Sequence, residues 1–315
     1  MKFAELRRTL HRIVLAGLPA LALTSCDADH KTKVVQIQQP ASPALQQLIN
    51  ACATGVDPSA CAVLCNETGF TDVVGCELTR EGAVATVTID YEGKETCGVA
   101  GRRPAGLRAP GAIASASAAG AWLAGAARLE AASVHAFVAL ARDLSAHGAP
   151  AALRRAAVRA AHEEACHAAA VGALAAAAGA APAPVDVPPP RRRSLVAMAI
   201  ENATEGCVGE TWAALIAHWQ AQHAADPAAR AVLAAIADDE TGHAELAWAT
   251  NRWAERRLDA RGRARVAAAR RRAVARLEAN VGRAVPAGEV VHRLGVPDRG
   301  AARRLFAEAR ARLWA

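Results

Sequence analysis

Two Glu-x-x-His steps are the features of this chain best suited to chemistry. They run from Glu164 to His167 and from Glu240 to His243, and both lie in long, alanine-rich stretches. On an α-helix, residues three apart project from one face, so each step presents a carboxylate and an imidazole to a common point. Carboxylates and imidazoles together are typical ligands of transition metals, so each step could form half of a metal site.

The setting of each step matters more than its spacing, because a third step, Glu289 to His292, also has this spacing. Glu164 and His167 fall on a stripe of apolar positions three and four residues apart, the pattern of a helix face turned toward a protein core. The third step has no such stripe and no partner placed symmetrically about a turn. We interpret it as a chance match and expect the two earlier steps to point inward.

A further carboxylate precedes each step by about one helix length. Glu130 and Glu164 are equally far from the turn-like residues 147–150. Two antiparallel helices joined by a tight turn place such residues at the same height. The same construction places Glu210 opposite Glu240. Two helical hairpins would therefore present four carboxylates and two imidazoles at one level.

The assignment on the third helix has an alternative. Glu205 lies on a bulkier apolar stripe than Glu210, but it is five residues farther from the turn, which is about 7 Å along a helix. Height favours Glu210 as the ligand, and Glu205 is a candidate for an exchanging ligand or for a residue just outside the ligands. Cys166 and Cys207 lie close to the same positions. They could fill space in the core, form a disulfide between two helices, or act as a redox pair.

Residues 115–257 resemble the ferritin-like superfamily, and within it the rubrerythrin-type and hydroxylase-type di-metal bundles rather than true ferritins. The resemblance rests on one carboxylate on each of the first and third helices and one Glu-x-x-His step on each of the second and fourth. It implies a ferritin-like four-helix bundle that holds two iron ions, with manganese as the alternative. The metal ligands that it implies in this chain are Glu130, Glu164, His167, Glu210, Glu240 and His243.

The chain as a whole is expected to be mainly α-helical. Residues 182–193 are rich in proline and would carry the chain from one hairpin to the other. Residues 258–315 are rich in arginine and predict a basic helical extension, in which residues 295–298 separate two short helices. The four helices of the bundle are expected at residues 115–146, 150–178, 194–224 and 227–257.

Residues 1–26 have the pattern of an export signal. Lys and Arg side chains precede an apolar run at residues 13–23, which is too short to span a bilayer as a helix. The following Cys26 completes a sequence that resembles the lipobox of bacterial lipoproteins. The resemblance implies that Cys26 carries lipid and anchors the protein in a membrane of the cell envelope, facing the periplasm. An ordinary cleaved signal with a fortuitous Cys26 is the alternative.

Three further segments are expected between this signal and the bundle: a polar tether at residues 27–42, a small cysteine-rich module at 43–100 and a linker rich in Pro and Gly at 101–114. In an exported protein, the cysteines of a small module predict disulfides that stabilise a small core. Residues 83–91 are rich in β-branched side chains, with Val84, Val87 and Ile89 among Thr residues, and predict a strand. The cysteines of the module are Cys52, Cys61, Cys65, Cys76 and Cys97.

Composition and charge exclude several functions. The net charge of +7 is concentrated in the arginine-rich C-terminal segment, but an exported protein meets no chromosome, so we expect no nucleic-acid partner. The single tyrosine, Tyr91, lies outside the bundle, so a tyrosyl radical is not available close to the metals. A protein held on a lipid tether, with extra modules, cannot easily build a closed shell for iron storage.

These features favour an envelope-anchored di-metal oxidoreductase that oxidises Fe(II) or another reductant with O2 or peroxide. Two other functions stay open. A non-catalytic metal-binding lipoprotein would bind metal without turnover, and a structural or interaction lipoprotein with a vestigial site would bind no stoichiometric metal. The sequence names no protein partner for any of the three.

Overall fold

The computed structural model describes residues 3–16, 30–38, 47, 50, 73–81, 84–92, 101–109, 115, 117–189, 191–283 and 286–314. The chain forms two compact units. Residues 23–95 make up the smaller one, and residues 1–22 together with 96–315 make up the larger one.

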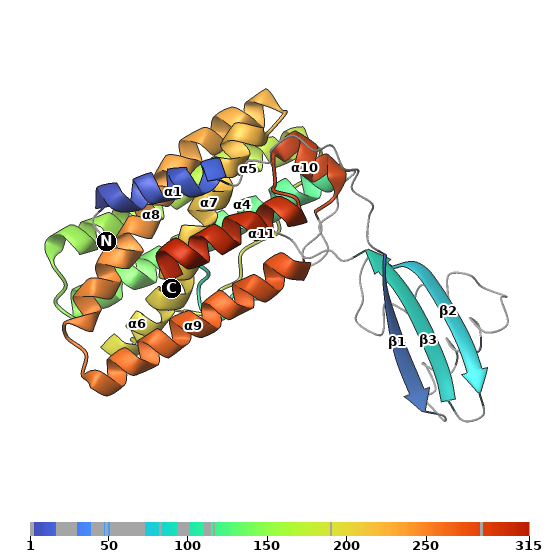
Figure 1. Cartoon of the computed structure of the whole chain (residues 1–315), viewed down its shortest axis with the longest axis horizontal. Coiled ribbons are helices and arrows are strands. Elements are labelled where there is room, and N and C mark those ends of the chain that lie inside the picture. The colour runs from blue at the N-terminus through green and yellow to red at the C-terminus, as the bar shows by residue number, and fades with distance from the viewer. Residues whose placement is uncertain are drawn as a thin grey trace. The chain divides into compact units, whose positions relative to one another are not determined.

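The described part of the smaller unit is an antiparallel sheet with the strand order β1-β3-β2 (Figure 1). The strands are β1 (His30–Gln38), β2 (Val73–Glu81) and β3 (Val84–Glu92). The central strand, β3, places Val87 opposite Val35 on one side and Leu78 on the other. The strand expected at residues 83–91 is confirmed as β3. β1 lies within the stretch interpreted as a tether, where β-branched residues among Lys and Gln side chains favour a strand.

The predicted disulfides and lipidation lie largely outside the described residues. Cys76 is on β2. The other cysteines that carry these predictions are outside the described residues: Cys26, Cys52, Cys61, Cys65 and Cys97. Their bonding and modification stay predictions.

The larger unit is mainly helical, and its first hairpin consists of α4 (Ala118–Ala146) and α5 (Ala151–Ala177). Ser117 caps α4 by accepting a hydrogen bond of 3.0 Å from the backbone N–H of Gly120. The tight turn between the helices contains Gly148, whose φ of +66° favours glycine. Ser117 therefore defines where the hairpin begins, and Gly148 defines where it turns.

The second hairpin consists of a long broken helix followed by α8 (Pro227–Glu255). The broken helix runs through α6 (Leu195–Glu201), a π-helical segment η1 (Asn202–Glu210) and α7 (Thr211–His223). Asp226 caps α8, and Pro227 occupies its first turn, where proline is tolerated. All four helices expected from the sequence are confirmed to within a few residues.

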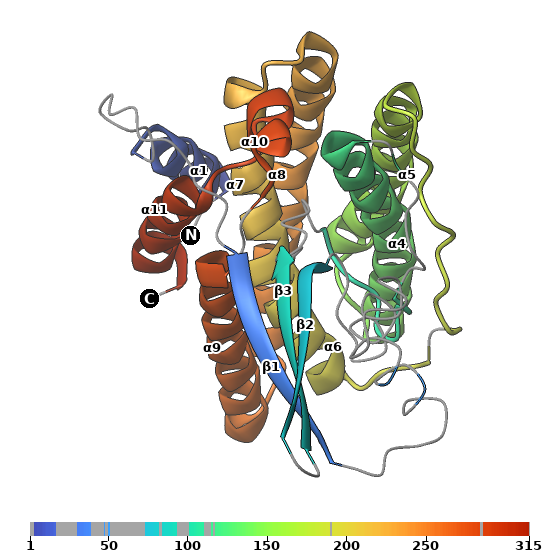
Figure 2. The same ribbon diagram turned by 90° about the vertical axis from the view of Figure 1, so that its right-hand side faces the viewer.

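The two hairpins pack through small side chains. Figure 2 shows α4 beside α5 and α7 beside α8, and α5 also contacts α8. Alanines supply much of the buried surface, which lets the helices approach closely, while Trp122, Leu215 and Trp219 fill the wider spaces. Among the described residues, α4 is the helix long and apolar enough to cross a membrane, but most of its apolar stretch is buried in this unit.

The C-terminal segment adds more helices to the same unit. They are α9 (Ala260–Arg283), α10 (Gly288–Leu294), α11 (Arg299–Ala309) and η2 (Arg310–Trp314). The basic helix and the break at residues 295–298 are as expected. Gly295 makes this break with a φ of +64°, and a side chain there would collide with the backbone of Ala224. α10 thereby lies against the turn that ends α7.

The first described helix, α1 (Phe3–Ala16), belongs to the larger unit. It packs against α7, α8 and α11, and Figure 1 shows it beside α11. Its apolar face is buried and consists of Leu6, Leu10, Ile13 and Val14. These residues fall within the expected export signal, whose remaining residues, 17–26, lie outside the described part of the chain.

Candidate metal centre

Six buried side chains meet between the two hairpins, and they are the six that the sequence singles out. They form two overlapping groups, and within each group the ligand atoms lie within 4.8 Å of one another. Glu164 and Glu240 belong to both groups. Glu130 and His167 complete one, called here the Glu130/His167 half-site. The Glu210/His243 half-site is completed by Glu210 and His243.

The donor atoms of this centre lack hydrogen-bond partners. Each of the six residues has at least one buried nitrogen or oxygen atom without a partner. Leaving such an atom unpaired costs about 1–3 kcal/mol, and more for a charged group. The orphaned atoms converge at one place and are the oxygen and nitrogen donors that transition metals bind. The buried clusters could therefore hold metal ions.

Burial and mutual repulsion disfavour charge on the carboxylates in the absence of metal. Burial raises the pKa of Glu164 well above 4.5, and the neighbouring carboxylates of Glu130 and Glu240 add to the rise. Burial and the carboxylate of Glu210 do the same for the pKa of Glu240. Burial also raises the pKa of Glu210, against the opposing charges of His243 and Arg102. The centre therefore requires protons or cations to be stable.

Each ligand histidine is held by a carboxylate from the opposite hairpin. His167 Nε2 on α5 lies 3.1 Å from Asp239 Oδ2 on α8. His243 Nε2 on α8 lies 3.0 Å from Glu163 Oε2 on α5. In both rings, Nδ1 is thereby left facing the centre, 3.8 Å from the nearest Glu240 oxygen. Such carboxylates fix the tautomer and orientation of metal-binding histidines.

The roles of Glu163 and Asp239 were missed in the sequence, although a signal was present. Each immediately precedes the glutamate of a Glu-x-x-His step, so both steps read acid-Glu-x-x-His. The hydrogen bond to His243 lowers the pKa of Glu163. Burial tends to lower the pKa of His167, but the carboxylates of Glu130 and Asp239 outweigh it and raise that pKa. Each of the two pairs between the hairpins therefore places a carboxylate beside an imidazole.

Glu210 and Glu205, the two alternative ligands on the third helix, both lie in the π-helical segment η1 but differ in their position relative to the centre. Glu210 is the last residue of η1 and is fully buried in the centre. Glu205 lies outside both groups, where its Oε2 accepts a hydrogen bond of 3.4 Å from the backbone N–H of Arg103. Burial and the neighbouring charge of Glu201 raise the pKa of Glu205. The height argument for Glu210 agrees with the structure, while Glu205 borders the centre.

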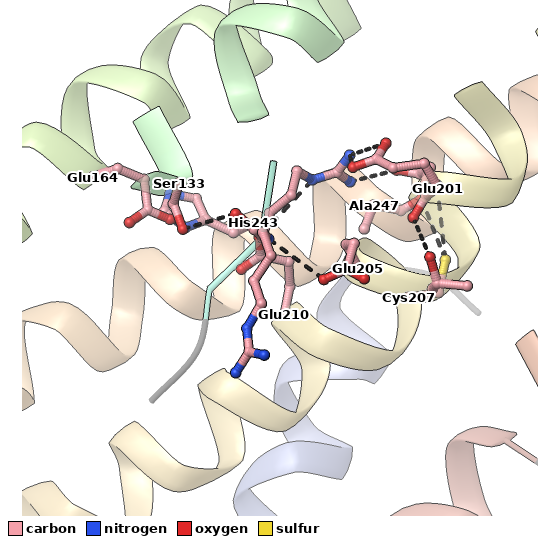
Figure 3. A network of polar contacts seen from close by, with 12 residues as sticks. Ser133, Glu164, Glu201, Glu205, Cys207, Glu210, His243 and Ala247 are labelled. Carbon is pink, nitrogen blue, oxygen red and sulfur yellow. Dashed lines mark hydrogen bonds and ion pairs between the residues drawn. The ribbon is translucent and has the colours of Figure 1, made fainter. Parts of the chain in front are cut away.

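A segment interpreted as linker reaches the metal centre. In residues 101–109, Gly101, Arg102 and Pro104 are buried. The Arg102 guanidinium pairs with Glu201 at 3.0 Å and donates to Asn202 Oδ1 at 2.7 Å. Figure 3 shows the polar network that contains Glu201, Glu210 and His243. No sequence signal predicted a buried arginine here, because Pro and Gly content alone favours a loop.

The two cysteines near the centre do not form a disulfide with each other. Both are free, with Cys166 exposed and Cys207 buried. The Cys207 thiol donates to the backbone oxygen of Ala247 at 3.6 Å, and burial raises its pKa to about 12. Cys207 therefore has the character of core filler, which is one of the expected alternatives.

A cavity of about 400 Å³ lies next to the centre. It is bounded by α5 and α8 and reaches the outer side of His243 and its partner Glu163. Gly242 also lines it, and a side chain added there would meet no atom within 4 Å. Arg7 of α1 borders the cavity and pairs with Glu245 at 3.1 Å. The cavity is thus a route by which small solutes could approach the histidine side of the centre.

The third Glu-x-x-His step lies apart from this centre, as expected. Glu289 Oε2 accepts a hydrogen bond of 3.3 Å from the backbone N–H of Ala119, at the start of α4. Its other oxygen pairs with Arg293 at 3.1 Å. Glu289 therefore has ordinary partners, in contrast to the six converging residues.

Comparison with protein families, with characterised proteins and with solved structures gives no significant match to this chain. The geometry of the centre is therefore the basis for assigning a function. Four buried carboxylates and two imidazoles, two of the carboxylates shared, can hold cations close together and leave positions open for a further ligand.

Proposed function

We propose that the larger unit is a ferritin-like four-helix bundle with a di-metal centre, and that it is an oxidoreductase. In this proposal, the protein oxidises Fe(II) or another reductant and passes the electrons to O2 or peroxide. The observation that carries the proposal is the convergence of orphaned donor atoms from Glu130, Glu164, His167, Glu210, Glu240 and His243.

Charge balance supports two divalent ions. Four ionised carboxylates carry four negative charges, and burying them unpaired would cost several kcal/mol for each. Two divalent cations neutralise this charge, while the imidazoles complete the coordination without adding any. A pair of iron ions would supply two electrons in one step, and manganese would fit the same donors.

Side chains of the protein would bind the ions, orient the imidazoles and exclude bulk water. Glu164 and Glu240 would contribute to both half-sites, because both belong to both groups. Glu163 and Asp239 would hold the imidazoles in the orientation that leaves Nδ1 free. The buried alanine-rich walls keep bulk water away, which strengthens every electrostatic interaction inside. The cavity bordered by Gly242 would admit a small oxidant or a cation.

We further propose that the protein is a lipoprotein of the cell envelope, anchored through Cys26 and facing the periplasm. The support is the sequence of residues 1–26, with its positive region, short apolar run and lipobox-like end. Mass spectrometry of the protein isolated from membranes tests this directly. A mature chain that begins at lipid-modified Cys26 is expected, and an unmodified Cys26 would contradict the anchor.

Metal analysis of the protein purified from membranes in detergent tests the di-metal proposal. We expect two metal ions per chain in the wild type, and little metal after Glu164→Ala combined with Glu240→Ala. Glu289→Ala is the matched control, because it changes a Glu-x-x-His step outside the centre. Retention of metal by the double variant would reject this centre.

Rapid mixing then separates catalysis from binding. The protein loaded anaerobically with Fe(II) is mixed with O2 or with peroxide, and ferric absorbance is followed. Multiple turnovers are expected of an oxidoreductase. Stoichiometric metal without turnover would instead favour a metal-binding lipoprotein, and absence of metal would favour a structural protein with a vestigial site.

A further inference from the structure

Arg102 is the one arginine among the largest fully buried side chains of the described residues. Buried arginines require partners, because an unpaired charge is expensive to desolvate. Two of its nitrogens have them, since Nη1 pairs with Glu201 and Nη2 donates to Asn202. Nε has no hydrogen-bond partner and lies 4.0 Å from Glu210 Oε1. The Nε side of the Arg102 guanidinium therefore faces Glu210, a candidate ligand of the metal centre.

The same guanidinium also reaches His243 through an aromatic ring. Its carbon lies 5.4 Å from the centroid of the Phe137 ring, within the range of a cation–π contact. The Phe137 ring in turn packs on the His243 imidazole, with 4.9 Å between the ring centroids. Arg102 thus lies beside Glu210 and is linked to His243 through Phe137, and both are specific to the Glu210/His243 half-site. It forms no ion pair with Glu130.

The chain makes room for this side chain at two glycines. A Cβ at Gly206 of η1 would collide with Arg102 Nη2. A Cβ at Gly101 would lie 2.7 Å from Ser133 Oγ, and that hydroxyl donates to the Arg102 backbone oxygen at 3.0 Å. The position of Arg102 is therefore set from both its backbone and its side chain. Neither glycine has a positive φ, so close approach is the reason for each.

We propose that Arg102 is a positioning residue for one half of the metal centre. This role rests on the proposed di-metal function. Arg102 fixes Glu210 directly and His243 through Phe137, so the Glu210/His243 half-site depends on Arg102. The Glu130/His167 half-site is independent of Arg102. The two half-sites, although built from similar ligands, are then unequal.

Cobalt binding to the metal-free, full-length protein tests this inference. Co²⁺ is titrated by calorimetry, and its visible absorption reports the geometry of each half-site. Wild type is expected to bind two ions. Arg102→Met is expected to bind one ion as wild type does and the other about tenfold more weakly or worse, the range seen when groups that hold metal ligands are lost. Arg103→Met is the control, because Arg103 is the exposed neighbour.

Two reference variants identify which half-site is affected. Glu210→Gln impairs one half-site and Glu130→Gln the other, so each leaves the absorption spectrum of the opposite half-site. The spectrum of Arg102→Met with one Co²⁺ is expected to match that of Glu210→Gln. Arg102→Lys keeps the charge but not the planar fork, so it should restore binding only in part. If Arg102→Met fails to fold, the comparison of Arg102→Lys with wild type decides.

The outcomes separate this inference from the proposed function. Equal weakening of both ions in the Arg102 variants would mean a general structural role and would overturn the inference. Unchanged binding of both ions would overturn it as well. Absence of Co²⁺ from the wild-type protein would reject the metal centre itself, and with it the role of Arg102.

Discussion

His243 of α8 and Glu163 of α5 form a hydrogen bond of 3.0 Å across the two hairpins, Nε2 to Oε2. The matching pair, His167 and Asp239, runs in the opposite direction between the same two helices. Each hairpin thus supplies both a candidate metal-binding imidazole and the carboxylate that contacts the imidazole of the other hairpin. The orientation of the ligands therefore depends on correct packing of α5 against α8.

Removing these carboxylates should weaken metal binding without removing a ligand. We expect Glu163→Gln and Asp239→Asn each to lower metal affinity by about 10- to 100-fold, because the imidazoles lose their orienting partner. Calorimetric titration with Mn²⁺ measures the effect. Asp238→Asn is a suitable control, since Asp238 is exposed and pairs with Arg7 at 3.7 Å. Equal affinities in all three variants would contradict the orienting role.

The stability of the metal-free protein should fall as pH rises. The folded state raises the pKa values of Glu164 and Glu240 well above 4.5, first through burial and then through neighbouring carboxylates. Their stabilising effect is fully present below about pH 4.5 and is lost as pH rises through the raised values. Thermal unfolding in a chelator, from about pH 5 to pH 8, measures this loss.

Metal should reverse that dependence, because cations compete with protons for the same oxygens. The difference in Tm between the Mn²⁺-bound and metal-free protein is therefore expected to widen with pH. Replacing Glu164 and Glu240 together by Gln should flatten the metal-free profile. A metal-free wild type whose Tm is constant or rises over this range would contradict the assigned electrostatics.

Two glycines of η1 should respond oppositely to alanine. At Gly206 a Cβ would lie 2.7 Å from the Cβ of Ala247, besides its collision with Arg102. Gly206→Ala should therefore destabilise the protein by about 1–3 kcal/mol. At Gly209 a Cβ would have Thr204 O as its nearest neighbour, at 3.8 Å, which is an ordinary contact. Gly209→Ala should be neutral, or stabilising by up to about 1 kcal/mol. Denaturant unfolding of both variants checks this, and similar losses in both would refute the packing argument.

Filling the cavity should slow access to the centre without changing its capacity. Gly242→Leu places a side chain in the cavity, where a Cβ has no neighbour within 4 Å. We expect slower Fe(II) uptake in stopped-flow mixing but the same final number of bound ions. Gly172→Leu on α5 is the matched control, because its Cβ also has no neighbour within 4 Å and it does not line the cavity. Equal uptake rates in the two variants would exclude this route.

The six converging residues could be predicted because helix geometry is a local rule. Residues three apart share a face, and residues equidistant from a tight turn share a height. That rule also favoured Glu210 over Glu205. It could not predict η1, because the extra residue of a π-helical turn is not encoded in a 3.6-residue periodicity.

The burial of Arg102 could not be predicted for a different reason. Its partners Glu201 and Asn202 lie about a hundred residues away in the chain, and no periodicity connects them. Glu163 and Asp239 could have been found, since the acid-Glu-x-x-His pattern occurs in both steps. In the smaller unit, β1 was missed because its Lys and Gln side chains resemble those of a polar tether.

Neither hairpin alone contains a complete half-site. The group of Glu130, Glu164 and His167 requires Glu240, and the group of Glu210, Glu240 and His243 requires Glu164. During synthesis, the first hairpin emerges with three of the four donors of its half-site. The fourth, Glu240, is made 76 positions after Glu164. Capture of the ions is thereby postponed until the whole bundle has been translated and closed. An ion bound there would then hold the two hairpins together, so that the hairpins could separate only when the metal is released.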